Sequence, residues 1–257
     1  MNVHEQYVAF LTIVRKEIKR YLRIWTQTLL PSAITMSLYF VIFGTLIGSR
    51  IGEMDGFTYM EFVVPGLIMM AIVTNSYSNV VSSFFGSKFS HSVEELLVSP
   101  VSNFVILMGY VVGGVSRGLL VAVVVTLVSL FFTDLSIHSY FVVVVVVLMT
   151  STLFALAGFI NAVYANSFDD ISIIPTFVLT PLIYLGGVFY SMDLLPEFWA
   201  NVSKLNPLVY VVNAFRYGVL GVSDVSLSFA LGMIAFFTAV AFGYSMHLLN
   251  SGKRLRQ

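Results

Sequence analysis

The sequence contains no cysteine and few charged residues. Charged residues make up 10% of the 257 residues, and 13 Lys and Arg balance 13 Asp and Glu. Soluble domains carry about a quarter of their residues as charges, so this chain has too little polar surface for a soluble globule. Without cysteine there are no disulfides, thiolate zinc sites or cysteine nucleophiles. The zero net charge gives no electrostatic basis for binding nucleic acid.

Motifs for catalysis and nucleotide binding are also missing. Gly86, Ser87 and Lys88 lack the earlier glycine and the following hydroxyl of a phosphate-binding G-x-x-x-x-G-K-[ST] loop. Four histidines are scattered without the spacing of a metal site: His4, His91, His138 and His247. The acidic pairs Glu94-Glu95 and Asp169-Asp170 fall in short loops, where a solvated surface explains them. We therefore expect no enzyme, no cofactor and no metal.

Long apolar blocks dominate the sequence, since 58% of the residues are hydrophobic. A helix needs roughly 20 apolar residues to cross a bilayer core, and an open strand cannot satisfy its backbone in lipid. The sequence therefore predicts an all-α, polytopic membrane protein. Six spanning segments are expected, at residues 29–46, 62–85, 104–132, 140–163, 171–189 and 227–249.

Basic residues predict the orientation of the chain. Residues 1–28 do not resemble a cleavable signal peptide, because their five basic residues are spread out and no A-x-A-like site follows the first apolar block. With the N-terminus inside, nine basic residues lie in cytoplasmic segments: Arg15, Lys16, Lys19, Arg20, Arg23, Lys88, Lys253, Arg254 and Arg256. Three lie outside: Arg50, Lys204 and Arg216. Positive residues favour the cytoplasmic side, so both ends are expected there. Residues 1–28 would form an interfacial segment, 29–250 the membrane domain and 251–257 a basic tail.

The first segment has the pattern of an amphipathic helix. Its apolar side comprises Tyr7, Leu11, Val14, Ile18, Tyr21, Leu22 and Trp25, and its basic side Lys16, Lys19, Arg20 and Arg23. Such a helix lies in the inner membrane interface, with its cations towards anionic lipid. A gating role and a simple topology anchor are equally compatible with this pattern.

A second short cytoplasmic helix is predicted after the second span. Ser92 can cap it, Glu94 and Glu95 suit the dipole of its first turn, and Pro100 would stop it after Ser99. Leu96 and Leu97 would form its apolar face. The segment fits either an ordinary loop with a helical turn or a docking element for a cytoplasmic partner.

Several polar residues interrupt the apolar blocks. Arg117 lies in the third block, where a central arginine costs roughly 3 kcal/mol. It suits a packed site bonded to carbonyls, a translocation path or a subunit interface. Four glycines beside it form two G-x-x-x-G pairs, which permit close helix packing: Gly109 with Gly113, and Gly114 with Gly118. In the second block, Asn75 and Asn79 share a face beside Tyr77, and either join helices or line a polar route.

The stretch 208–220 is too short and too polar to span, because it holds Asn213 and Arg216. It suits a helix that dips into the outer leaflet. The surrounding residues resemble the signature of ABC-2 type permeases, the membrane subunits of many bacterial exporters: Leu179, Leu182, Leu185, Gly186, Val188, Leu195, Pro196, Pro207, Leu208, Tyr210 and Arg216. The family pattern gives Pro207, Tyr210 and Arg216 no chemical role. On physical grounds we expect Pro207 to break the hairpin and Arg216 to anchor its end at the outer surface.

The resemblance implies six spanning helices, an interfacial helix, a coupling helix between spans two and three, and re-entrant helices at 196–220. It also implies a homodimer served by two separate ATP-binding cassette subunits. A self-sufficient channel or an ion-coupled carrier is the alternative, disfavoured because no acidic residue falls within a predicted span. The substrate stays open. The 23 Phe and 13 Tyr could stack on sugars, but aromatic belts at both interfaces explain most of them.

Overall fold

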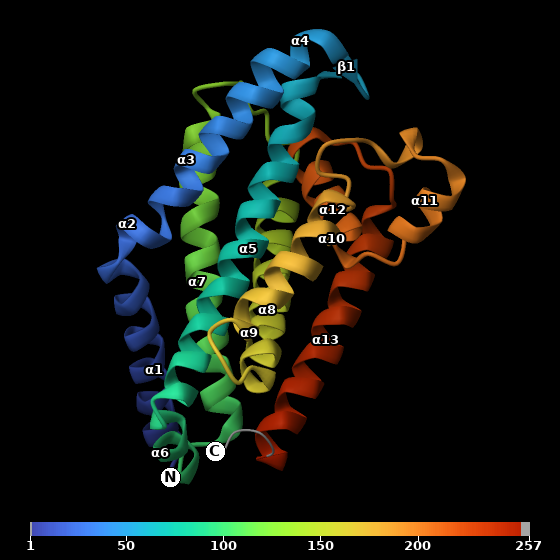
Figure 1. Ribbon diagram of the computed structural model, residues 1–257. Coiled ribbons are helices and arrows are strands. Elements are labelled where there is room, and N and C mark those ends of the chain that lie inside the picture. Colours follow the sequence, from blue (N-terminus) through green and yellow to red (C-terminus); the bar gives the residue numbers. More distant parts are fainter. Residues whose placement is uncertain (1, 253–257) are drawn as a thin grey trace.

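A computed structural model describes residues 2–252, apart from the side chain of Thr45. Most of the predicted basic tail, with Lys253, Arg254 and Arg256, lies outside these residues. The described chain is almost entirely helical (Figure 1). The beginning of α1 (Val3–Arg23), the short helix α6 (Ser92–Val98) and the end of α13 (Leu227–Ser251) lie together at one end of the bundle, opposite the hairpin of β1 (Glu53–Met54) and β2 (Phe57–Thr58).

The first apolar block forms a bent helical stretch. It runs through α2 (Trp25–Thr28), α3 (Leu30–Tyr39), the π-helix η1 (Phe40–Ile47) and α4 (Gly48–Ile51). The chain then passes through the hairpin and returns along α5 (Tyr59–Phe89) to α6. The helices α7 (Asn103–Ser129) and α8 (Tyr140–Tyr164) complete the central group.

The last third of the chain is more broken. It consists of α9 (Asp170–Ile174), the π-helix η2 (Pro175–Leu179), α10 (Thr180–Tyr184), the 3-10 turn η3 (Met192–Leu194), α11 (Glu197–Ser203), α12 (Pro207–Leu220) and α13. The stretch 208–220, expected to dip into the outer leaflet, is α12, and the region 196–220 consists of α11 and α12, called here the hairpin. Pro207 is the first residue of α12, where its missing N–H costs no hydrogen bond.

Local sequence signals explain where the helices start and stop. Reciprocal capping boxes begin α1 at Asn2 with Glu5 and α5 at Thr58 with Glu61. Ser102, Ser139 and Asn206 accept backbone N–H groups at the starts of α7, α8 and α12. Two glycines in the left-handed region, Gly221 and Gly252, end α12 and α13.

Five described helical stretches are long and apolar enough to cross a membrane: Trp25–Ile51, Tyr59–Phe89, Asn103–Ser129, Tyr140–Tyr164 and Leu227–Ser251. The predicted fifth span, 171–189, is instead the shorter apolar helix Asp170–Tyr184. It ends because Gly187 adopts a φ of 74°, which turns the chain into the loop before α11. At about 1.5 Å per residue such a helix is shorter than a typical hydrocarbon core. A complete sixth crossing therefore stays a prediction.

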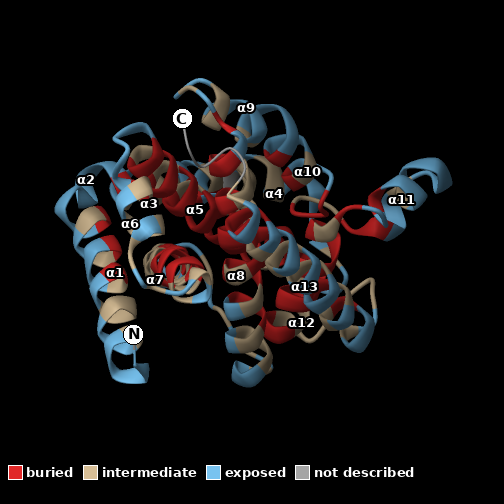
Figure 2. Ribbon diagram, turned by 90° about the horizontal axis from the view of Figure 1, so that it is seen from below, coloured by how far each residue is buried: buried red, intermediate tan, exposed pale blue. Residues whose placement is uncertain are grey.

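The core lies around α5, which is buried over most of its length between α7 and α8 (Figure 2). By contrast, only 12% of the most apolar window of Trp25–Ile51 and 17% of that of α13 is buried. The outer helices of the bundle thus leave apolar faces uncovered within this single chain. In a membrane protein these faces meet lipid or another subunit.

Candidate functional site

The short helix α6 lies where the prediction placed it, between the second and third apolar helices. Its start differs from the prediction, because His91 in a left-handed conformation is the N-cap residue and makes no side-chain cap bond. The Ser92 hydroxyl instead donates to the carbonyl oxygen of Ser87. At the other end Ser99 is extended, as expected for a residue before proline.

The apolar residues of α6 divide between the bundle and the solvent. Leu96 and Leu97 are half-buried and pack on the core, so they are less free than the sequence suggested. Val98 is the most exposed apolar residue of this helix, at 79%. Glu95 is exposed beside it, and Glu94 is half-buried with its carboxylate 3.3 Å from Nδ1 of His91. Val98 and Glu95 are therefore the apolar and the acidic side chain that α6 leaves exposed.

A cavity of about 390 Å³ separates α6 from α1. It is lined by residues of α1, of α6 with its C-cap residue, and of α7: Thr12, Ile13, Lys16, Ser92, Glu95, Leu96, Ser99 and Tyr110. The linker after α6 is nevertheless attached to α1. The side-chain amide of Gln6 donates to the carbonyl oxygen of Pro100 (3.0 Å), and its oxygen accepts the backbone N–H of Ser102 (3.0 Å). This contact was not predicted from the sequence.

The helix α1 packs along α7 through the first of the two glycine pairs. Its buried residues are Ile13, Glu17 and Tyr21, which are spaced by four. A Cβ atom added to Gly113 would lie 2.6 Å from Cβ of Glu17, so only glycine permits this approach. Tyr7, Leu22 and Trp25, which the sequence placed on the apolar face, are exposed. The face that packs is therefore not the most apolar one.

A buried polar cluster joins α1 to α5. The Ser83 hydroxyl donates to a Glu17 carboxylate oxygen at 2.6 Å, and the other Glu17 oxygen lies 3.4 Å from Nη2 of Arg20. The same Nη2 donates to both the backbone and side-chain oxygens of Asn79, at 2.8 and 2.9 Å. Arg20 was expected on the face towards lipid headgroups. It turns to α5 because Glu17 and the Asn79 oxygens satisfy its charge there.

A second cluster lies one helical turn away along α5. Arg117 donates to the side-chain oxygen of Asn75 at 2.9 Å and to the carbonyl oxygen of Thr28 at 3.4 Å. The Asn75 amide in turn donates to the hydroxyl of Ser32 on α3 at 3.0 Å. The arginine therefore has protein partners, and Asn75 joins three helices. These contacts favour a packing role for Arg117 over a free charge on a path.

Tyr77 and the second glycine pair contact helices other than α1. Tyr77 is buried, and its backbone lies against Gly158 on α8. The second glycine pair, Gly114 and Gly118, faces Ser76 and Val80 of α5 and Ser151 and Ala155 of α8. The first glycine pair thus packs against α1, and the second packs against α5 and α8.

Arg216 differs most from expectation. It is fully buried instead of anchoring the hairpin at the outer surface. Its guanidinium carbon lies 3.8 Å from the centre of the Phe62 ring, and Nη2 donates to the carbonyl oxygen of Gly187 at 2.6 Å. Partial burial and the nearby carboxylate of Asp224 raise the pKa of Asp55, while Arg216 opposes that rise. Through its contacts with Phe62 and Gly187, Arg216 joins α12 to α5 and to the loop after α10.

Other signature residues build the turn around α12. The Tyr210 hydroxyl donates to the carbonyl oxygen of Lys204, which closes the turn between α11 and α12. Pro196 is the N-cap residue of α11, and Gly186 lies in the turn after α10. The sequence missed Asn206, whose amide donates to the carbonyl oxygen of Leu182 at 2.6 Å. The signature thus marks residues that shape the hairpin.

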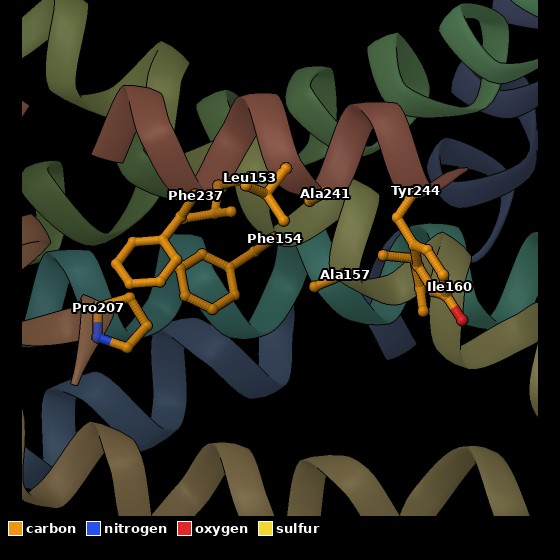
Figure 3. A pocket seen from close by; sticks show the side chains of 9 residues that line it. Leu153, Phe154, Ala157, Ile160, Pro207, Phe237, Ala241 and Tyr244 are labelled. Carbon is orange, nitrogen blue, oxygen red and sulfur yellow. The ribbon is translucent and has the colours of Figure 1, made fainter. Parts of the chain in front are cut away.

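Pro207 also lines an apolar groove of about 300 Å³ beside α8 and α13 (Figure 3). Figure 3 shows Leu153, Phe154 and Phe237 gathered near this proline, and Tyr244 at the other end. The Tyr244 hydroxyl is hydrogen-bonded to that of Tyr164. Such a lining suits hydrocarbon and offers no nucleophile or acid–base pair. Within residues 2–252, no three His, Asp or Glu side chains come close enough to hold a metal ion.

Comparison with known proteins places these features in a family. The family model described as ABC-2 type transporter matches residues 8–220. The inner membrane transport permease YadH of Escherichia coli (strain K12) is 55% identical over 254 residues, which cover 99% of each chain. Nodulation protein J of Sinorhizobium fredii is 23% identical over 214 residues, covering 83% of this chain and 81% of that protein. Nodulation protein J of Rhizobium meliloti is 21% identical over 241 residues, covering 93% and 92%.

Proposed function

Because the chain belongs to the ABC-2 type transporter family, we propose that it is the membrane subunit of an ATP-driven exporter. The family match and the permease relatives confirm the predicted resemblance and a transport role. A multi-pass protein of the inner membrane agrees with the apolar helices and with the relative named as an inner membrane permease.

The observation that carries the proposal is the position of α6. It projects at the end of the bundle where α5 leads into α7, with Glu95 and Val98 exposed. The sequence has no phosphate-binding loop, so in this proposal the ATP that drives transport is bound by a separate protein. A small exposed helix with an apolar anchor and an acid suits a groove on that protein.

In the proposed assembly, two copies of the chain enclose the path and two ATP-binding subunits dock on the two α6 helices. ATP-driven closure of those subunits would move α6 and shift the equilibrium between inward-open and outward-open or occluded states. The uncovered faces of Trp25–Ile51 and Asp170–Tyr184 are long enough to contribute to a subunit interface. Both chain ends would lie in the cytoplasm.

The ion-coupled alternative requires a buried acid that can exchange protons or bind a cation. Glu17 is a buried acid of this kind, although it lies before the predicted spans. Its two oxygens are already held by Ser83 and Arg20, so the site is charge-compensated and leaves no open ligand position for a cation. The structure therefore gives this alternative no free ion site at Glu17.

The deciding experiment is reconstitution with candidate ATP-binding subunits in lipid nanodiscs. The chain alone should hydrolyse no ATP, and a complex with an ATP-binding subunit should hydrolyse it. Mass photometry should give two copies of each. ATP turnover by the pure chain, or transport in vesicles without any ATP-binding subunit, would refute the proposal.

A further inference from the structure

We propose that α1 is a strut that links the coupling helix α6 to the middle of α5, with Gln6 as the positioning residue at one end and the Glu17–Arg20 pair at the other. The inference rests on the proposed function, since it concerns how movement of α6 reaches the bundle. It assigns a task to three side chains outside the predicted coupling helix. The family signature residues lie elsewhere in the chain.

The lower end of the strut is the amide contact of Gln6. Its two hydrogen bonds, both 3.0 Å, hold the backbone of the α6–α7 linker on either side of Val101. A primary amide that donates to one peptide group and accepts from another restrains both position and orientation. Movement of the linker is therefore passed to the N-terminal part of α1.

The upper end is the polar cluster on α5. Arg20 donates to the side-chain and backbone oxygens of Asn79, and Glu17 accepts from Ser83 one turn further on. Close packing at Gly109 and Gly113 already docks α1 on α7 without any charge. A buried ion pair adds little stability of its own, because desolvation offsets its attraction. Here the pair instead attaches α1 to defined positions on α5, through the hydrogen bonds to Asn79 and Ser83.

The space around α1 allows this movement. The cavity of about 390 Å³ lies between α1 and α6, so the two helices touch chiefly through the linker and not through a filled interface. Beyond Asn79, the next turn of α5 carries Asn75, which holds Arg117 and Ser32. A displacement of α5 at Asn79 therefore also reaches α3 and α7. Besides the direct contact of α6 with α5 at Ser87, a second path of contacts therefore runs from α6 through α1 to three membrane helices.

The first arm of the test uses the permease alone in nanodiscs. Hydrogen exchange is measured by mass spectrometry in Gln6→Ala and in the matched control Gln27→Ala, whose side chain is exposed on α2. Gln6→Ala should speed exchange several-fold in the linker peptide that contains the Ser102 amide, and Gln27→Ala should not. Equal protection in both variants would overturn the Gln6 attachment.

The second arm uses the complex with an ATP-binding subunit. The chain has no cysteine, so a nitroxide on Thr74→Cys, an exposed position of α5, reports one distance between two copies. Addition of ATP and vanadate should change this distance. The change should fall by at least half in Gln6→Ala and in Arg20→Gln, but persist in Gln27→Ala and in Lys19→Gln, which removes an exposed charge from α1. ATP-binding subunits should copurify with all four variants.

An undiminished change in Gln6→Ala and Arg20→Gln would overturn the strut while leaving the proposed function intact. A chain that copurifies with no ATP-binding subunit would overturn the proposed function, and with it the task of the strut in transport. In that case the exchange arm would still decide whether Gln6 holds the linker. The two failures are thus distinguished by copurification.

Discussion

The Ser83 hydroxyl lies 2.6 Å from a carboxylate oxygen of Glu17, although Glu17 precedes every predicted span. This contact places a fully buried acid between α1, α5 and α7. Burying a carboxylate is costly unless hydrogen bonds and a counter-charge compensate it. Ser83 and Arg20 supply both, so α1 is part of the membrane bundle and not only a surface anchor.

Replacing Glu17 should destabilise the bundle through unpaired neighbours. Glu17→Leu replaces the carboxylate with an apolar side chain, which leaves Ser83 without its acceptor and Arg20 without its counter-charge. We expect a loss of about 1–3 kcal/mol in the free energy of unfolding, measured by chemical unfolding in mixed micelles. The double variant Glu17→Leu with Arg20→Leu should lose less than the sum of the two single changes. Additive losses would show that the pair is not coupled.

The glycine pair on α7 should be needed for the approach of α1. A Cβ atom at Gly113 would lie 2.6 Å from Cβ of Glu17, whereas Gly243 on α13 has no heavy atom within 4 Å of such an atom. Gly113→Ala should therefore cost about 1–3 kcal/mol, and Gly243→Ala should be neutral or slightly stabilising. Unfolding of both variants under the same conditions provides the comparison. Equal stability would place α1 away from Gly113 in the membrane.

The sequence predicted the helices better than it predicted their contacts. Apolar blocks located α5, α7, α8 and α13, and the acidic pair with Pro100 located α6, because these signals are local. The fifth block was drawn too long, since hydropathy does not register the turn that Gly187 makes. The glycine pairs correctly predicted close packing. Which helix each pair receives depends on the tertiary arrangement, which a single sequence does not contain.

For the polar residues too, positions along a helix were predicted correctly and their partners on other helices were not. Asn75 and Asn79 were placed on one face from their spacing, and both do join helices. Glu17 was overlooked because it stands among basic residues before the first span. Arg216 was expected to reach the surface, and its burial depends on Phe62 and Gly187, which are distant in sequence. Spacing along one helix is readable from sequence, whereas partners on other helices are not.

Cysteine labelling can test the six-crossing topology, because the natural chain has no cysteine background. Ser136→Cys and Asn201→Cys are exposed positions expected outside, and Ser90→Cys and Ser251→Cys are exposed positions expected in the cytoplasm. A membrane-impermeant maleimide applied to spheroplasts should modify the first pair at once and the second pair only after lysis. Protection of Asn201→Cys until lysis would show that Asp170–Tyr184 does not carry the chain across the membrane.

The exposed end of α6 should carry the docking of the ATP-binding subunit. Leu96 and Leu97 pack on the core, so truncating them would confuse docking with stability. Val98 is 79% exposed and can be changed without opening a cavity in the bundle. Val98→Ser should weaken binding of the ATP-binding subunit by about 1–2 kcal/mol, the effect of losing one apolar anchor. Thermal stability of the permease alone should stay unchanged.

Glu95→Lys should act differently from Val98→Ser. Reversing an exposed charge at an interface mainly slows association, and the effect weakens as salt rises. Leu205→Ser is the matched control, because Leu205 is 81% exposed on the α11–α12 hairpin, far from α6 in Figure 1. Surface plasmon resonance with permease in nanodiscs measures both rates at low and high salt. If the Val98→Ser and Glu95→Lys permeases bind the ATP-binding subunit with the same rates as the Leu205→Ser permease, the subunit docks elsewhere. The Asp169-Asp170 loop is then the next surface to test.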